Sequence, residues 1–255
     1  MAGTALTRGW AWLTTPPDDH PTDEDLRTAD VLGLRLPVRA TVAVLVTTLA
    51  VLSNISSLLV PTSIQELGRT PDGLRALAIE HLILYGLIPL AVVLIGFRDR
   101  PTRYGLTLGD VRAGLVLVTI GLVVMTPLAV WSASLPDVRA FYAQGTAPLP
   151  DLLLTNALEL TAAEFLFRGF LMLTLVRAVG PIGVVVAVMP FAVDHVNKPA
   201  IEVLSTLVGG LAYGWLAWRT RSIVWGSIAH IYLVTLVTVA AAPAAATVAA
   251  LNATR

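Results

Sequence analysis

The sequence predicts an all-α membrane protein, a polytopic transmembrane helix bundle of about seven spans with its N-terminus in the cytoplasm. Of its 255 residues, 56% are hydrophobic and 13% are charged, whereas an average soluble domain is about 25% charged. The mean hydropathy is +0.77, and several apolar runs reach the length of about 20 residues that a helix needs to cross a membrane. The zero net charge gives no reason to expect a nucleic-acid partner, and the absence of cysteine excludes disulfides and thiolate chemistry.

The pattern of polar and apolar segments divides the chain into four parts. Residues 1–36 are rich in acidic residues and proline and are interpreted as a polar cytoplasmic tail. Residues 37–150 are expected to form three transmembrane helices, 151–246 a transmembrane core that carries the motifs, and 247–255 a second tail. The expected spans are 38–60, 78–97, 113–134, 152–177, 181–196, 200–218 and 222–245.

The positions of the arginines favour this topology, because cytoplasmic loops of membrane proteins carry an excess of basic residues. The loops expected on the opposite side carry fewer basic residues, and acidic residues balance them. The arginines that flank the predicted cytoplasmic ends are Arg27, Arg35, Arg39, Arg98, Arg100, Arg103, Arg112, Arg177, Arg219 and Arg221.

Ionisable residues within the apolar C-terminal half indicate a functional site. A charged side chain in the centre of a membrane costs roughly 2.5–3.5 kcal/mol even on lenient insertion scales, and such residues usually face a protein interior or an aqueous cavity. Glu164 and Arg168 are four residues apart on one predicted helix, so they share a face and can pair. The alternative to a functional site is a structural ion pair whose only role is to join two helices.

His195, Glu202 and His230 complete the candidate site. Pro199 cannot continue a helix without loss of a hydrogen bond, so the chain is expected to break just after His195. Broken backbone at membrane depth is tolerated where it lines a cavity. The residues around the break, Asp194, Asn197 and Lys198, are equally well explained as an ordinary polar loop, and His20 and His81 fall outside the group.

Two carboxylates, a guanidinium and two imidazoles allow three kinds of chemistry. A carboxylate and an imidazole can activate water for hydrolysis while a second imidazole stabilises the oxyanion. Alternatively, Glu164, His195 and His230 can bind a divalent metal such as zinc, with water as the fourth ligand. The third possibility is a relay for protons or ions.

Three short motifs resemble those of the CAAX prenyl protease and bacteriocin-processing (CPBP) family. The first is Ala163-Glu164-Phe-Leu-Phe-Arg168-Gly169, the second is Phe191-Ala-Val-Asp-His195, and the third is His230-Ile-Tyr-Leu-Val234. The resemblance covers about 155–238 and implies an intramembrane protease in which Glu164 is the base, His195 orients the water, and His230 with Arg168 stabilises negative charge.

The chain departs from the family pattern at two positions. Ala163 stands where family members carry the first glutamate, and Val234 stands where they carry an asparagine. The segment from His195 to Glu202 is similar to a bacterial subgroup with a single glutamate in the first motif and a His-x-x-Lys-Pro-x-x-Glu motif. Glu202, or more weakly Glu159, is therefore a candidate for the second carboxylate.

The sequence leaves two functional hypotheses open. The first is an intramembrane endopeptidase in a bacterial plasma membrane that cleaves a membrane-associated protein. The second is an inactive relative that acts as a scaffold, immunity factor or accessory subunit of a membrane complex. Both imply contact with membrane lipids, and neither requires a cofactor, although a divalent metal stays open.

Overall fold

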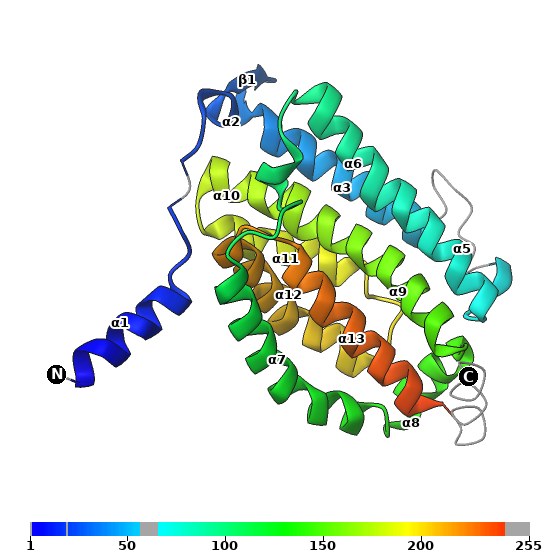
Figure 1. Ribbon diagram of the computed structural model, residues 1–255. Helices are drawn as coiled ribbons and strands as arrows, with labels where there is room; N and C mark the ends of the chain where they lie inside the picture. The colour runs from blue at the N-terminus through cyan, green and yellow to red at the C-terminus, as the bar shows by residue number, and fades with distance from the viewer. Residues whose placement is uncertain (1, 19, 57–65, 243–255) are drawn as a thin grey trace.

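The protein is a bundle of long helices, with a short helix and a small hairpin at one end (Figure 1). The computed structural model describes residues 2–18, 20–56 and 66–242. The elements of the N-terminal half are α1 (Ala2–Thr14), α2 (Asp23–Leu26), β1 (Thr28–Val31), β2 (Leu34–Pro37), α3 (Val38–Ser56), α5 (Pro71–His81), η1 (Leu82–Leu87), α6 (Ile88–Ala91), η2 (Val92–Gly96), η3 (Pro101–Tyr104) and α7 (Val111–Ser132). Those that follow are α8 (Pro136–Tyr142), η4 (Ala143–Gly145), α9 (Leu149–Glu164), η5 (Phe165–Met172), α10 (Leu173–Val179), α11 (Ile182–Val193), α12 (Ala200–Thr220) and α13 (Val224–Ala241).

The helical bundle confirms the predicted fold class at the level of architecture. Within the described ranges, five helices are long and apolar enough to cross a membrane: 38–56, 71–96, 111–132, 200–220 and 224–241. Two further predicted spans are also helical, but α11 is short and the stretch 149–179 carries several charges. Seven crossings and a cytoplasmic N-terminus therefore stay predictions. The predicted ends 57–60 and 243–245, and the second tail 247–255, lie outside the described residues.

The helix made of α9, η5 and α10 forms the centre of the bundle (Figure 1). Every residue of η5 is buried, and its aromatic side chains meet those of the surrounding helices. The ring of Phe167 lies edge-on to Tyr85 at 5.7 Å and to Phe191 at 5.3 Å, and Phe170 stacks on Phe97 at 6.1 Å. These contacts hold the central helix between α3, α5–η2 and α11, so its charged residues face protein rather than lipid.

Local sequence signals explain where the helices that carry the site begin and end. The Asp110 carboxylate accepts a hydrogen bond from the backbone N–H of Ala113 and caps α7. A break was predicted just after His195. The structure confirms a break before Pro199, but the helix ends two residues before His195: α11 ends at Val193 and α12 begins at Ala200. His195 thus lies in the short connection between two helices.

The first 36 residues contain regular structure, which the interpretation as a polar tail did not anticipate. Strands β1 and β2 pair antiparallel, with Thr28 opposite Pro37. Leu32 and Gly33, which connect them, both have positive φ angles (52° and 81°), as a tight two-residue hairpin turn requires. The hairpin is exposed, and it adds a small β element to the otherwise helical protein.

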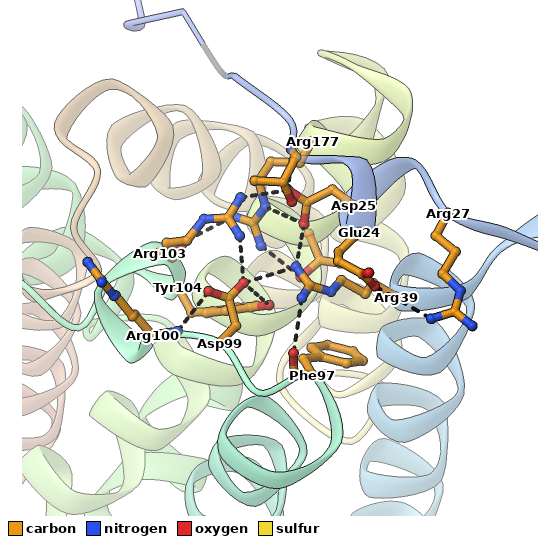
Figure 2. A network of polar contacts seen from close by, with 12 residues as sticks. Glu24, Asp25, Arg27, Arg39, Phe97, Asp99, Arg100, Arg103, Tyr104 and Arg177 are labelled. Atoms are coloured by element: carbon orange, nitrogen blue, oxygen red, sulfur yellow. Dashed lines mark hydrogen bonds and ion pairs between the residues drawn. The ribbon is translucent and has the colours of Figure 1, made fainter.

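A buried ion cluster attaches this N-terminal region to the bundle (Figure 2). The Asp25 side chain is 1% exposed and accepts hydrogen bonds from Arg39 at 2.9 Å and Arg103 at 2.6 Å, while Arg177 lies 3.5 Å away. Asp99 joins the cluster and accepts hydrogen bonds from Arg39 and Arg103 at 3.0 and 2.6 Å. These arginines come from three segments far apart in sequence, so Asp25 joins the N-terminal region to three parts of the fold.

We predict that Asp25→Ala destabilises the protein far more than Asp23→Ala does. Loss of Asp25 leaves buried guanidinium groups without their main counter-charge, and breaking a buried ion pair in this way costs about 3–5 kcal/mol. Asp23 is an exposed carboxylate two residues earlier in the same short helix, so its variant controls for the charge change. Thermal unfolding in detergent micelles measures the difference, and equal melting temperatures for the two variants would contradict the role of Asp25.

The cluster also predicts a dependence of stability on pH. Burial alone would raise the pKa of Asp25, but hydrogen bonds from the Thr22 backbone and from Arg103, together with the charge of Arg177, hold it well below its ordinary value. A lowered pKa in the folded state means that Asp25 contributes its full stability above the unfolded pKa, about 3.9, and that this contribution is lost as the pH falls further. The difference in melting temperature between wild type and Asp25→Ala should therefore be constant from pH 7 to 5 and shrink below pH 4.

Candidate active site

Glu164 is the most completely buried ionisable residue of the predicted site. It ends α9 in the centre of the bundle and is 0% exposed. Its Oε1 accepts a hydrogen bond of 2.9 Å from Nδ1 of His230, which lies in the middle of α13. A carboxylate that accepts from one imidazole nitrogen fixes the tautomer, so that the other nitrogen, Nε2, carries the lone pair of the neutral ring. The sequence placed these two residues in one site, and the structure shows that they form a direct pair.

The predicted contact between Glu164 and Arg168 is also confirmed. Nη1 of Arg168 lies 3.4 Å from Oε1 of Glu164, although the two groups are not aligned as a hydrogen bond. The guanidinium packs on the face of the Phe191 ring, 3.9 Å from its centre, and stays 2% exposed. Arg168 therefore balances the charge of Glu164 and is itself stabilised by an aromatic face.

The backbone around this pair departs from a regular α-helix. Residues 165–172 form η5, a π-helical stretch in which the N–H of Leu173 donates to the carbonyl of Arg168. Such π-helical turns inside α-helices are rare and often occur at functional sites. Gly169 is part of this stretch, and a Cβ there would lie 2.4 Å from the Tyr104 carbonyl oxygen. The sequence analysis did not predict this widened turn.

Gly226 makes room for the Glu164 carboxylate on the opposite helix. A Cβ at Gly226 would lie 3.0 Å from Oε2 of Glu164, and this oxygen is buried without a hydrogen-bond partner. The ring of Tyr213 stacks on His230 at 5.2 Å. Glycine and tyrosine thus hold the carboxylate and the imidazole in one arrangement.

His195 lies beside this pair but is not bonded to it. Its Nδ1 is 2.8 Å from the backbone carbonyl of Phe191, and since a carbonyl only accepts, Nδ1 carries the proton. Nε2 of the neutral ring is then an acceptor. His195 is 5% exposed and its ring lies 4.4 Å from that of Phe191, so packing on one side and a hydrogen bond on the other fix its orientation.

A cavity of about 280 Å³ connects the two imidazoles. His195 and His230 both line it, and so do Ala163 and Val234, the two positions at which the chain departs from the family pattern. Glu164 does not line it; His230 stands between the carboxylate and the cavity. With a share of about 30 Å³ per molecule in the liquid, several waters or a short stretch of peptide would fit.

Glu202, the proposed second carboxylate, lies elsewhere. Its oxygens accept hydrogen bonds of 2.8 Å from Lys198 and from the Tyr142 hydroxyl. Lys198 and Tyr142 line the cavity, whereas Glu202 is behind them. The structure therefore brings Glu164, Arg168 and His230 together, places His195 beside them on the cavity wall, and puts Glu202 in a separate group.

The residues of the proposed metal site do not form a metal-binding group. In the part of the chain that the structure describes, no three His, Asp or Glu side chains are arranged to hold an ion. Glu164 and His230 bond to each other, and Nδ1 of His195 bonds to a carbonyl. Within the described residues the three predicted ligands therefore do not converge on one ion position, and we derive no step through a metal.

Several residues of the cavity wall were missed by the sequence analysis. Their shared feature is a polar side chain in the N-terminal half of the bundle or in the loop after α11, in places interpreted as apolar spans or as an ordinary loop. They are Asn54, Arg69, His81, Tyr142 and Asp194. A usable signal existed for Asn54 and His81, because polar residues within apolar spans commonly mark sites.

Fold and site together define a polytopic membrane protein with a buried carboxylate–imidazole pair beside a polar cavity. Residues 145–236 match the family model described as Type II CAAX prenyl endopeptidase Rce1-like. This match confirms the resemblance drawn from the three motifs: residues 145–236, which carry them, are similar to the CAAX proteases. The comparisons with curated proteins and with solved structures gave no match.

We predict that Gly226→Ala disturbs the buried pair while Gly209→Ala does not. Both glycines are within helices, where alanine is favoured by about 0.5–1 kcal/mol, and a Cβ at Gly209 meets nothing within 4 Å. At Gly226 the new methyl group presses on Glu164, which its bond to His230 prevents from moving freely. We expect Gly226→Ala to melt at a lower temperature than Gly209→Ala in detergent, and the reverse order would show that the carboxylate has room to shift.

Proposed function

We propose that this protein is an intramembrane endopeptidase that hydrolyses a peptide bond in a membrane-associated protein. The observation that carries the proposal is the 2.9 Å bond between Glu164 and His230, with His230 on the wall of a cavity shared with His195. The family match supports the class of reaction. As a multi-pass protein of the plasma membrane, it would meet its substrate among membrane lipids.

In the proposed mechanism, His230 is the general base and Glu164 is the residue that orients it. Nδ1 of His230 is held by the carboxylate, so Nε2 can take a proton from a water in the cavity. The carboxylate then stabilises the imidazolium that forms, as acidic partners of catalytic histidines do. This differs from the assignment of Glu164 as the base, because Glu164 is not in contact with the cavity.

The remaining residues of the predicted site have supporting roles in this mechanism. Nε2 of His195 accepts a hydrogen bond from the same water and directs its oxygen toward the substrate carbonyl. Arg168 stabilises the Glu164 charge and does not reach the cavity. Lys198 and Arg69 are the cations among the described residues that line the cavity, so positive charge for the oxyanion would come from them.

The alternative function is that of an inactive relative acting within a membrane complex. The observation that favours it is the pair of apolar side chains, Ala163 and Val234, on the cavity wall where family members carry a glutamate and an asparagine. On this hypothesis Glu164, Arg168 and His230 serve only to join α9–η5 to α13. Stable co-purification with other membrane proteins, together with an unchanged phenotype of Glu164→Gln, would support it.

The test of the peptidase proposal is the rate of cleavage by Glu164→Gln and His230→Gln. The purified protein is reconstituted in liposomes and offered internally quenched peptides with and without an S-farnesyl cysteine. Because general base catalysis contributes about 10²–10⁴-fold, we expect each variant to lose at least a hundredfold in kcat with intact folding. His20→Gln, which changes an exposed histidine, is the matched control.

Three outcomes distinguish the two functions. Cleavage by wild type and by His20→Gln, but not by the two site variants, supports the peptidase. A wild-type rate for Glu164→Gln overturns the roles given to the pair. Absence of cleavage by the wild type on every peptide favours the inactive relative.

A further inference from the structure

A second pair of ionisable side chains, His81 and Glu159, lines the same cavity. Nδ1 of His81, at the end of α5, lies 3.8 Å from Oε1 of Glu159 in α9, and both residues line the cavity. His81 is 5% exposed, and its Nδ1 is buried without a hydrogen-bond partner. A buried polar atom with no partner in a cavity is unusual in folded proteins and calls for an explanation.

A chain of hydrogen bonds fixes the orientation of His81. The Asn54 amide donates to the Asp194 carboxylate at 2.9 Å, so its carbonyl oxygen faces His81, 3.1 Å from Nε2. Since an amide oxygen only accepts, Nε2 of His81 carries the proton. The Tyr85 hydroxyl also donates to Asp194, and the rings of Tyr85 and His81 stack at 4.3 Å.

This orientation leaves Nδ1 of His81 directed at Glu159 and the cavity. The neutral ring presents a lone pair there, and a protonated ring presents an N–H to the Glu159 carboxylate. A proton can therefore reside on either side of the pair. Glu159 is one helical turn before Ala163, on the same face of the helix, so its carboxyl group lies next to the position at which the family glutamate is replaced.

We propose that Glu159 and His81 form the general acid of this active site, which protonates the leaving amine. This inference rests on the proposed function. The oxygen of the cavity water forms a bond to the carbonyl carbon as its proton passes to Nε2 of His230. The C–N bond then breaks as the nitrogen takes the proton held by the His81–Glu159 pair. Transfer of the His230 proton to that pair through cavity water restores the starting state, and one water is consumed for each bond cleaved.

In this mechanism different elements supply the base and the acid. His230 on α13 and His195 in the connection after α11 bind and activate the water, whereas His81 on α5 and Glu159 on α9 protonate the leaving group. Hydrogen bonds from His81 to Asn54 and from Asn54 to Asp194, the residue before His195, connect the acid to the segment that carries His195. An acid and a base that line one cavity can each reach a substrate bound there.

The leaving group provides a test that separates a general acid from a structural role. An amide nitrogen must be protonated before it leaves, whereas the p-nitrophenolate of an activated ester leaves without a proton. We expect Glu159→Gln and His81→Gln to lower kcat for a quenched peptide by 10²–10⁴-fold and to change hydrolysis of the matching p-nitrophenyl ester less than threefold. Glu24→Gln, at an exposed carboxylate, is the control.

The outcomes distinguish failure of this inference from failure of the proposed function. If Glu159→Gln cleaves the peptide as fast as wild type does, the assignment of the general acid is wrong. The same holds if the variant loses peptide and ester hydrolysis to the same extent. In both cases the proposed peptidase function is unaffected. If wild type cleaves neither substrate, the peptidase proposal falls and the inference falls with it. The assignment of the general acid is also wrong if ¹⁵N NMR of the histidine-labelled protein at neutral pH places the His81 proton on Nδ1 instead of Nε2.

Discussion

The burial of one carboxylate determines the arrangement of the centre of this protein. Glu164 has no contact with solvent, and an isolated charge in such surroundings would cost many kcal/mol. Three features compensate it: the hydrogen bond from His230, the nearby charge of Arg168 and the space left by Gly226. Arg168 lies on the central helix, and His230 and Gly226 lie on α13. The contacts that stabilise the buried carboxylate therefore determine the relative orientation of these two helices. The position of His230 at the cavity is a consequence of that packing.

The catalytic proposals draw on both halves of the chain, although the family match covers only residues 145–236. The matched segment supplies Glu164, His195 and His230. Other residues that line the cavity come before it, including Asn54, Arg69, His81 and Tyr142. Helices outside the family match therefore contribute part of the cavity lining.

Sequence reasoning was successful where the information is local and failed where it depends on packing between helices. The pairing of Glu164 with Arg168 follows from a spacing of four residues, and the break before α12 follows from Pro199. The bond from Tyr142 to Glu202 did not follow, because Tyr142 reaches Glu202 only once α8 and α12 have met. His81 was excluded for a similar reason: its bond to Asn54 joins two helices whose relative placement no periodicity specifies.

The ion cluster around Asp25 has a consequence for biosynthesis. Asp25 leaves the ribosome early, whereas Arg103 and Arg177, which complete its surroundings, are made only after several hydrophobic helices have been synthesised. The pair with Arg39 can form early, but the other contacts of Asp25 must wait until those helices have entered the bilayer. Complete docking of the N-terminal segment is a late event in assembly, and until it occurs the arginines repel one another at the end of the bundle. The fully attached segment thus marks a chain in which α3, η3 and α10 have come together.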